Sequence, residues 1–408
     1  MVESFGFNRR QFGGLVAGLT ASLGAGSAWA QNTRPFKLGA LNSITGAGGV
    51  YGPGMLEAIK LAVKEVNDAG GAAGRKFEIF AEDDQTRADA AVLAAKKLVE
   101  ITKVEAIVGI WPSAVQLAVM PITNAAGIIT MNTSGAPEID ENDKLDLVWQ
   151  FYGSNVIFGR AFAETVRKLG YKRPGVMAFN NATMLAQARY FQKTWEEKGD
   201  KVVDFIPYEP NQTSYRTELD RLLSKKPDII SASSYLPDLT IILKEWYQSG
   251  IPCKFIAPGW SANETLARTL GADVVDGILS VSNVPATQNP AFKHFSSAFK
   301  AATGREPETF AAASYDMVIC LALALQAAGA EATPAQIASK IRTVAEQPGK
   351  KVSSFAEGRE LLLKGEKIDF DGASAPLTFT PEGRSTPDFG IYEFQKDKLV
   401  LKEVIRLT

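Results

Sequence analysis

Residues 109–138 read GIWPSAVQLAVMPITNAAGIITMNTSGAPE, and this stretch decides the fold class. The apolar run at 106–110 predicts a strand that is buried on both faces. Val115, Val119 and Ile122 then recur at helical spacing, and Gly127 ends the predicted helix. A second apolar run, at 128–131, predicts a second strand. Two parallel strands joined by a helix bring the turns that follow them to one edge of one sheet.

Both of these turns are polar and rich in hydroxyl groups. Trp111, Pro112 and Ser113 follow the first strand, and residues 132–135 follow the second. Free backbone N–H groups and the hydroxyls of Ser113, Thr133 and Ser134 are suited to holding a small anion at such an edge. The alternative interpretation is that these are ordinary helix-capping residues.

The alternation of strands and helices extends to both sides of this stretch. Two successive blocks, 36–148 and 149–284, each alternate strands with helices, which predicts an α/β protein with doubly wound parallel sheets. A cleft can form between the carboxyl edges of two such sheets. Helical patterns follow from residue 289. Residues 376–380, 389–394 and 399–405 alternate in polarity, which predicts an antiparallel, hairpin-like finish.

Composition is that of an ordinary globular protein. The chain has 408 residues, of which 46% are hydrophobic and 22% charged, and its net charge is −1. This balance gives no electrostatic reason to expect nucleic acid or an anionic membrane as a partner.

The first 30 residues are predicted to be an export signal rather than part of the fold. Arg9 and Arg10 form a twin-arginine pair, a short apolar run follows, and residues 28–30 have the small-x-small pattern of a cleavage site before Gln31. The alternative is a retained membrane anchor. No later stretch has eighteen consecutive apolar residues, so we expect a soluble, periplasmic mature protein.

Catalytic motifs are missing from the sequence. His294 is the only histidine and is expected at a surface or rim position, so no Ser-His-Asp set can be assembled. The glycines at 46–54 do not have dinucleotide-binding spacing, and Asp83-Asp84 is expected to anchor a loop. We therefore expect no enzyme activity, no cofactor and no metal. Export would permit a disulfide between Cys253 and Cys320, although two separately buried thiols are expected.

Several ordered features carry a family resemblance. Residues 40–46, 51–52, 66–71, 82–86, 135–138 and 311–316 resemble, in order and spacing, the type I periplasmic substrate-binding proteins of the branched-chain amino acid (Leu/Ile/Val-binding) family. The resemblance implies two α/β lobes joined by three crossovers, with a ligand held between the lobes. The lobes would comprise 36–148 plus 285–385 and 149–284 plus 386–408. It also implies ABC permease subunits in the inner membrane as partners, and we expect a monomer.

The resemblance also implies ligand-binding positions. The serine that binds the ligand carboxylate falls on Ser113, and the following turn falls on Thr133, Ser134 and Gly135. Two cleft tyrosines fall on Tyr51 and Tyr235.

The sequence departs from the family at one position. The acidic residue that pairs with the ligand's ammonium would fall near Gly259, where there is no carboxylate. Asp316 and Glu264 are the alternative partners that the sequence offers, but neither matches the motif. The expected cleft edge is instead aromatic, with Trp111, Phe151, Tyr152, Phe179, Tyr235 and Trp260. Of these, Phe151 and Phe179 are expected to pack internally, whereas Trp111 and Trp260 are expected at the ligand.

Three classes of function follow. The leading hypothesis is an exported solute-binding protein of an ABC importer for a small carboxylate with an aromatic or otherwise apolar body. Within the same class, the alternative is a branched-chain or other amino acid. A ligand sensor for a signalling partner would use the same cleft. An enzyme would need a nucleophile–base pair that the sequence does not offer.

Overall fold

The computed structural model describes residues 34–408, apart from positions 285–286, 288, 309, 347 and 406–408. The predicted export signal at 1–30 therefore lies outside the described residues.

The first sheet is entirely parallel, in the strand order β2-β1-β3-β4-β5. Buried apolar residues form its central strands, as the sequence predicts for a sheet covered on both faces. Its strands are β1 (Phe36–Asn42), β2 (Phe77–Asp83), β3 (Ala106–Ile110), β4 (Ile129–Asn132) and β5 (Val148–Gln150). Its connecting helices are α1 (Gly52–Asp68), α2 (Ala88–Lys96), which continues as a π-helix over Lys97–Thr102, α3 (Ser113–Ala126) and α4 (Pro137–Asn142).

The second sheet has the order β14-β13-β10-β9-β8-β6-β7. Its parallel strands are β6 (Pro174–Phe179), β7 (Phe205–Tyr208), β8 (Ile229–Ser233), β9 (Lys254–Pro258) and β10 (Leu279–Asn283). The hairpin of β13 (Phe389–Gln395) and β14 (Lys398–Ile405) adds antiparallel to β10, which confirms the predicted finish of the chain. Its helices are α5 (Asn155–Lys168), α6 (Ala182–Glu196), α7 (Arg216–Leu223), α8 (Leu236–Ser249), α9 (Glu264–Leu270) and α10 (Ala272–Val275).

The remaining helices pack within the first lobe. They are α11 (Pro290–Thr303), α12 (Ala311–Ala328), α13 (Pro334–Ala345) and α14 (Phe355–Leu363), with a small parallel pair of β11 (Lys350–Val352) and β12 (Ile368–Phe370). By length and composition α12 could cross a membrane, with a mean hydropathy of 1.6. However, 83% of that window is buried inside the protein, so α12 serves as a core helix.

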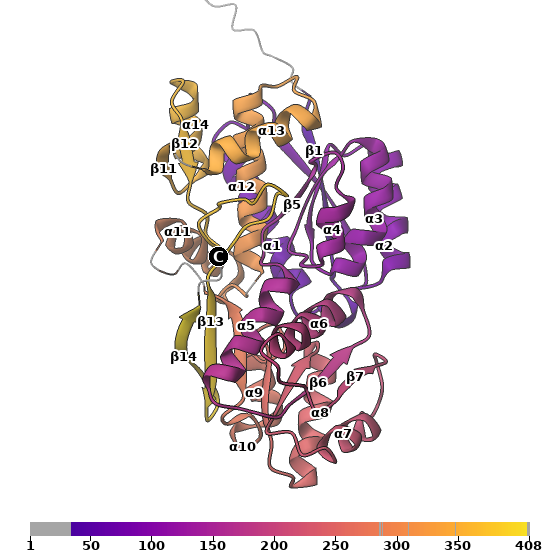
Figure 1. The fold of residues 1–408 in the computed structure, drawn as a ribbon. Helices are drawn as coiled ribbons and strands as arrows, with labels where there is room; N and C mark the ends of the chain where they lie inside the picture. The colour runs from indigo at the N-terminus through magenta and orange to yellow at the C-terminus, as the bar shows by residue number, and fades with distance from the viewer. Residues whose placement is uncertain (1–33, 285–286, 288, 309, 347, 406–408) are drawn as a thin grey trace, which may run out of the picture. The chain divides into compact units, whose positions relative to one another are not determined.

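The chain passes between the two sheets three times: after β5, after β10 and before β13 (Figure 1). This confirms the predicted class of two α/β lobes with three crossovers. Strand β5 extends the first sheet to Gln150, two residues beyond the segment end expected from the sequence.

The sequence prediction fails for residues 376–380. Among the described residues this stretch has only isolated bridges, Asp371 with Pro376 and Phe379 with Ser385. Pro376 and Pro381 lack the N–H donor that a continuous ladder needs, which explains the failure. The short elements α4, β5, β11, β12 and α14 were not expected from the sequence. An element of so few residues is too short to show a clear hydrophobic period.

Two side-chain expectations are confirmed and a third holds in part. Cys253 and Cys320 are both free thiols, as expected, but only Cys320 is buried, whereas Cys253 is partly exposed. His294 is half-exposed, with Nε2 3.1 Å from Glu65 Oε2. The carboxylate of Asp83 accepts hydrogen bonds from the loop at residues 44–45, as expected of a loop anchor.

Candidate functional site

The two polar turns are in direct contact at the carboxyl edge of the first sheet. Strand β3 ends before Trp111, and Pro112 caps α3 from an extended conformation, so that Ser113 is the first helical residue. Strand β4 ends at Asn132. The Ser113 Oγ atom accepts hydrogen bonds from the N–H groups of Gly135 and Ala136, each at 3.1 Å. The helix start and the second turn therefore form one unit.

These two bonds determine what the Ser113 hydroxyl can still do. A hydroxyl oxygen has two lone pairs and one proton. Both lone pairs are used by the turn, and no bond donated by this hydroxyl is found within the described part of the chain. Its remaining capacity is to donate a hydrogen bond, which suits an anionic ligand.

The second turn is held in place by bonds from several directions. The Thr133 N–H donates to the Ile110 carbonyl at 2.9 Å, and the Ser134 hydroxyl donates to the Trp111 carbonyl at 3.2 Å. The Asn155 N–H, at the start of α5, donates to the Gly135 carbonyl at 2.8 Å. The turn is thus tied both to its own sheet and to the first helix after the crossover.

A small cavity of about 20 Å³ lies beside this turn, roughly the room for one water molecule. Residues of both lobes line it, and none of the lining residues described is charged. They are Trp111, Pro112, Ser113, Thr133, Gly135, Tyr152, Asn155, Thr183, Met184, Tyr235, Trp260 and Phe310. Six of the eight ligand-binding positions expected from the sequence are among them.

Aromatic rings form the walls of this cavity. The Trp111 ring centroid lies 5.2 Å from that of Tyr235 and 5.7 Å from that of Phe310. Tyr152 lies 5.1 Å from Phe310, and Trp260 lies 6.3 Å from Tyr152. These separations are those of favourable aromatic pairs. The rings come from both lobes and meet across the crossovers.

The other two expected positions, Tyr51 and Ser134, do not line the cavity. The Tyr51 ring packs on Trp111 at 5.3 Å, and its hydroxyl accepts a hydrogen bond of 3.0 Å from Asn263 Nδ2 in the other lobe. The Ser134 side chain is turned back to the Trp111 carbonyl. Tyr51 therefore connects the lobes directly, whereas Ser134 supports the turn.

The tyrosine hydroxyls of the site remain protonated at neutral pH. Burial raises the pKa of Tyr235 to about 12 and that of Tyr51 further above its ordinary value. The Tyr235 oxygen accepts a bond of 3.1 Å from Asn181 Nδ2, so its own proton is left to donate. Both groups are neutral donors rather than anions.

Sequence reasoning missed Asn155, Thr183, Met184 and Phe310. Asn155 begins a helix and Phe310 precedes one, and nothing in their local pattern distinguishes them from ordinary terminal residues. The lining residues include buried polar groups that have no hydrogen-bond partner in the described ranges, among them Thr133 Oγ1, Asn155 Nδ2 and Trp260 Nε1. All three can donate, and a buried donor without a partner is a feature typical of a binding site.

Phe151 is buried, as expected, and it also lines the second, larger cavity described below. It is buried against Phe379, with ring centroids 5.4 Å apart. Phe179 is only partly buried and packs edge-on against Tyr208 and Tyr235, so it supports a wall of the cavity from outside.

The two carboxylates considered as ammonium partners lie elsewhere. The Glu264 side chain is 76% exposed and sits 3.8 Å from Arg268. Asp316 is buried and accepts bonds from the Ala373 N–H, the Ser374 N–H and the Ser374 hydroxyl, at 2.6 to 2.8 Å. At Gly259, an added Cβ would lie 2.5 Å from the Ser282 Cβ, which excludes a longer acidic side chain there without rearrangement.

We predict that Asp316 makes stability depend on pH. Burial raises its pKa to about 7, above its ordinary value of 3.8. The protonated form is therefore favoured by folding, and this stabilisation is full below pH 4 and lost as the pH rises through about 7. In Asp316→Asn, we expect a smaller drop in unfolding free energy between pH 5 and pH 8 than in the unchanged protein, measured by urea denaturation. An equal drop in both proteins would contradict this assignment.

A second, larger cavity of about 200 Å³ lies next to the first, and the two share Tyr152. Its lining includes Ser282, Asn283 and the carboxylate of Glu308. Glu308 Oε1 accepts a hydrogen bond of 2.6 Å from Arg305. The only carboxylate lining either cavity in the described residues is therefore paired through Oε1 alone, since Glu308 Oε2 is buried without a hydrogen-bond partner there, and it lies outside the aromatic cavity.

Residues 35–360 match the periplasmic binding protein family model. The chain belongs to this family. Periplasmic binding proteins of this family are solute-binding proteins of ABC transporters rather than enzymes. The family therefore assigns this chain a binding role in transport rather than catalysis.

Known relatives of this periplasmic binding protein are distant in sequence and similar in fold. The leucine-, isoleucine-, valine-, threonine- and alanine-binding protein of Pseudomonas aeruginosa is 24% identical over 309 residues, which cover 75% of this chain and 82% of that protein. The leucine-binding protein LivK of Thermotoga maritima has a TM-score of 0.78 at 22% identity, covering 91% and 98% of the chains. A solute-binding protein of R. palustris, in complex with benzoate, has a TM-score of 0.77 at 19% identity, covering 91% and 96%.

Proposed function

We propose that this protein captures a small carboxylate with an aromatic or otherwise apolar body between its two lobes and delivers it to an ABC permease in the inner membrane. The observation that carries this proposal is the aromatic cavity, which is uncharged and whose buried, unpartnered polar groups can all donate. The Ser113 hydroxyl, with both lone pairs in use, would donate to the ligand's carboxylate.

An ammonium group would be poorly accommodated in this cavity. A charge that is taken out of water without a partner costs several kcal/mol, or else the group loses its proton. None of the described residues lining the aromatic cavity carries a negative charge. An acid without an amine avoids this cost, and the R. palustris relative bound to benzoate is consistent with such a ligand.

An amino acid is the second candidate. The curated relatives include proteins named for binding leucine, isoleucine and valine. Glu308 in the adjoining cavity is the observation that favours this candidate, because its Oε2 is buried without a hydrogen-bond partner in the described residues and could receive an ammonium group. This would require the ligand to extend past Tyr152, which the two cavities share.

Binding is proposed to be coupled to closure of the lobes. A space of about 20 Å³ is too small to admit any acid with an aromatic ring, so the lobes would separate for entry. Contacts to both lobes, from Ser113 on one side and Tyr235 and Trp260 on the other, would then favour the closed state. The Tyr51–Asn263 hydrogen bond is one of the contacts that would break on opening.

Export is proposed to depend on Arg9 and Arg10, the twin-arginine pair. The mature protein would then act in the periplasm as a monomer. A ligand sensor for a signalling partner would use the same cavity. Uptake of the ligand that requires both this protein and the cognate permease would identify the transport function.

A calorimetric comparison of benzoate and L-leucine tests the proposal. The mature protein should bind benzoate, and a ligand present at 100 times its Kd should add about 2.7 kcal/mol to the stability and raise the melting temperature. Glucose serves as a control without a carboxylate. Tight binding of L-leucine with no response to benzoate would reject the aromatic acid and favour the second candidate.

A further inference from the structure

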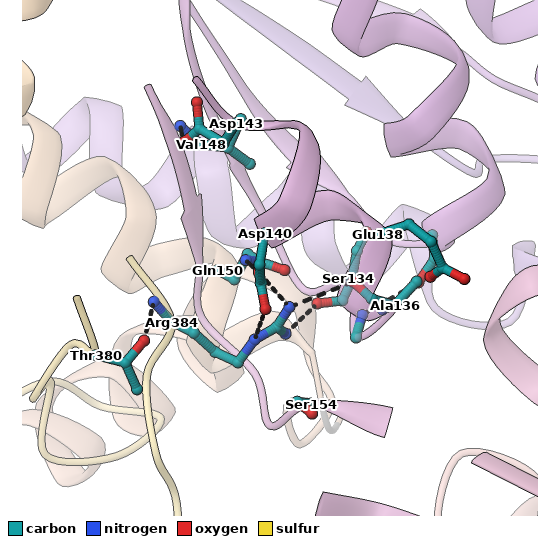
Figure 2. Close-up of polar contacts among 12 residues, drawn as sticks. Ser134, Ala136, Glu138, Asp140, Asp143, Val148, Gln150, Ser154, Thr380 and Arg384 are labelled. Atoms are coloured by element: carbon teal, nitrogen blue, oxygen red, sulfur yellow. Dashed lines mark hydrogen bonds and ion pairs between the residues drawn. The ribbon is translucent and has the colours of Figure 1, made fainter. Parts of the chain in front are cut away.

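A buried arginine from the last crossover reaches the back of the second turn. Arg384 lies 250 residues from Ser134 in sequence, and its side chain is only 4% exposed. Figure 2 shows its guanidinium group directed at Asp140 and at the carbonyls of Ser134 and Ala136. The Nη1 atom donates to the Ser134 carbonyl at 3.0 Å, and Nη2 lies 3.5 Å from the Ala136 carbonyl.

The guanidinium group is held in this position by its own partners. Asp140 on α4 accepts from Nη2 at 2.8 Å and from Nε at 3.4 Å, so the charge is balanced inside the protein. Gln150 on β5 donates to the same carboxylate, and its backbone pairs with residues 383–385. The planar fork of arginine suits this arrangement, in which one group contacts a carboxylate and two carbonyls at once.

The Ser134–Gly135 peptide group is hydrogen-bonded on both sides. Its carbonyl accepts from Arg384, and its N–H donates to Ser113 Oγ. In a trans peptide these two groups point in opposite directions, so a bond to the carbonyl fixes the direction of the N–H. Hydrogen bonds in a chain also polarise one another. A cation at the carbonyl end therefore strengthens the N–H bond to Ser113 and makes the Ser113 proton a better donor.

We propose that Arg384 is a positioning residue for ligand binding. It orients the 134–136 turn so that the turn occupies both lone pairs of the Ser113 hydroxyl, which leaves this hydroxyl to act toward the ligand as a hydrogen-bond donor. Arg384 does not line the cavity and acts through the turn. This inference rests on the proposed function insofar as the ligand is an anion held by Ser113. The orientation of the turn itself is independent of any ligand.

Arg342 provides a matched control within the same protein. It lies on α13 and donates to the carbonyls of Phe379, Thr380 and Pro381, in the segment that leads to Arg384. It also stacks over Trp149 at 4.9 Å. None of the contacts found for it in the described residues involves the 134–136 turn. Loss of either arginine frees backbone carbonyls, but only loss of Arg384 frees those of the turn.

The experiment compares Arg384→Gln, Arg384→Lys and Arg342→Gln in the mature protein. Hydrogen exchange of the amides at 133–136 is measured without ligand, and affinities for benzoate and for L-leucine are measured by calorimetry. We expect Arg384→Gln to speed exchange in the turn by about tenfold or more, and to weaken whichever of the two acids binds by about 10- to 100-fold. Arg384→Lys keeps the charge but not the planar, forked guanidinium group. Its exchange rate and its affinity should lie between those of the unchanged protein and those of Arg384→Gln. Arg342→Gln should change neither quantity, although it lowers the melting temperature.

Equal exchange in the turn for Arg384→Gln and Arg342→Gln would overturn the inference, as would unchanged affinity in Arg384→Gln. If the unchanged protein binds neither benzoate nor L-leucine, the proposed function fails, and the exchange comparison still decides whether Arg384 orients the turn. If Arg384→Gln does not fold, Arg384→Lys provides the same comparison with the charge retained.

Discussion

Replacing Ser113 with alanine is expected to weaken binding of benzoate by about 10- to 150-fold, or roughly 1.5–3 kcal/mol, the range for a hydrogen bond to a charged group. The hydroxyl has both lone pairs occupied by the Gly135 and Ala136 N–H groups, so its proton is the part of it that a ligand can use. Calorimetric titration of the variant with benzoate measures the effect directly.

Ser134→Ala is the control for this substitution. Ser134 is buried in the same turn, but its hydroxyl donates to the Trp111 carbonyl and its side chain does not line the cavity. It should lose roughly 1 kcal/mol of stability, the usual value for a neutral hydrogen bond, and little affinity. If the two variants lost affinity equally, Ser113 would have no special part in holding the carboxylate.

Replacing Trp260 with alanine is expected to reduce affinity for benzoate by about 30-fold or more, because the ligand loses both buried apolar area and a favourable ring contact. An aliphatic acid such as hexanoate should lose less, since it never makes the ring contact. The ratio of the two affinities, measured by calorimetry in the variant and in the unchanged protein, isolates the aromatic contribution.

Trp195→Ala controls for the loss of a large buried ring. Both tryptophans are buried in the second lobe and both have an unpartnered Nε1 in the described residues, but Trp195 packs on Phe191 and Arg167 and does not line the cavity. Each variant should lose about 3–5 kcal/mol of stability. Only Trp260→Ala should change the preference for benzoate over hexanoate. If the affinities for benzoate and hexanoate fell equally in Trp260→Ala, Trp260 would have no specific contact with the ligand's ring.

Much of the site could be predicted because its key residues follow strands. Ser113 comes directly after β3 and the 133–135 turn directly after β4, and neighbouring parallel strands end at one sheet edge. Tyr235 also follows a strand of its own lobe. The assignment of these residues to the ligand remains a prediction, whereas their meeting at one cavity is a property of the fold.

Other parts of the site have no local signal. Phe310 reaches the aromatic wall from the loop before α12, and Asn155 from the first turn of α5. A phenylalanine before a helix or an asparagine at its start has many ordinary roles, so neither is informative alone. Their position depends on how the crossovers bring the two lobes together.

The sequence alone determined the α/β class, the two blocks of alternating strands and helices, and the polar turns at one sheet edge, because periodicity and turn chemistry are local and are read within a few residues. Tertiary structure alone decided that Arg384 supports a turn 250 positions away, that Ser113 is left only a proton to offer, and that no acid side chain lines the aromatic cavity among the described residues. Those features depend on distances between segments remote in the chain, and such distances are set by packing of the whole core rather than by any local pattern.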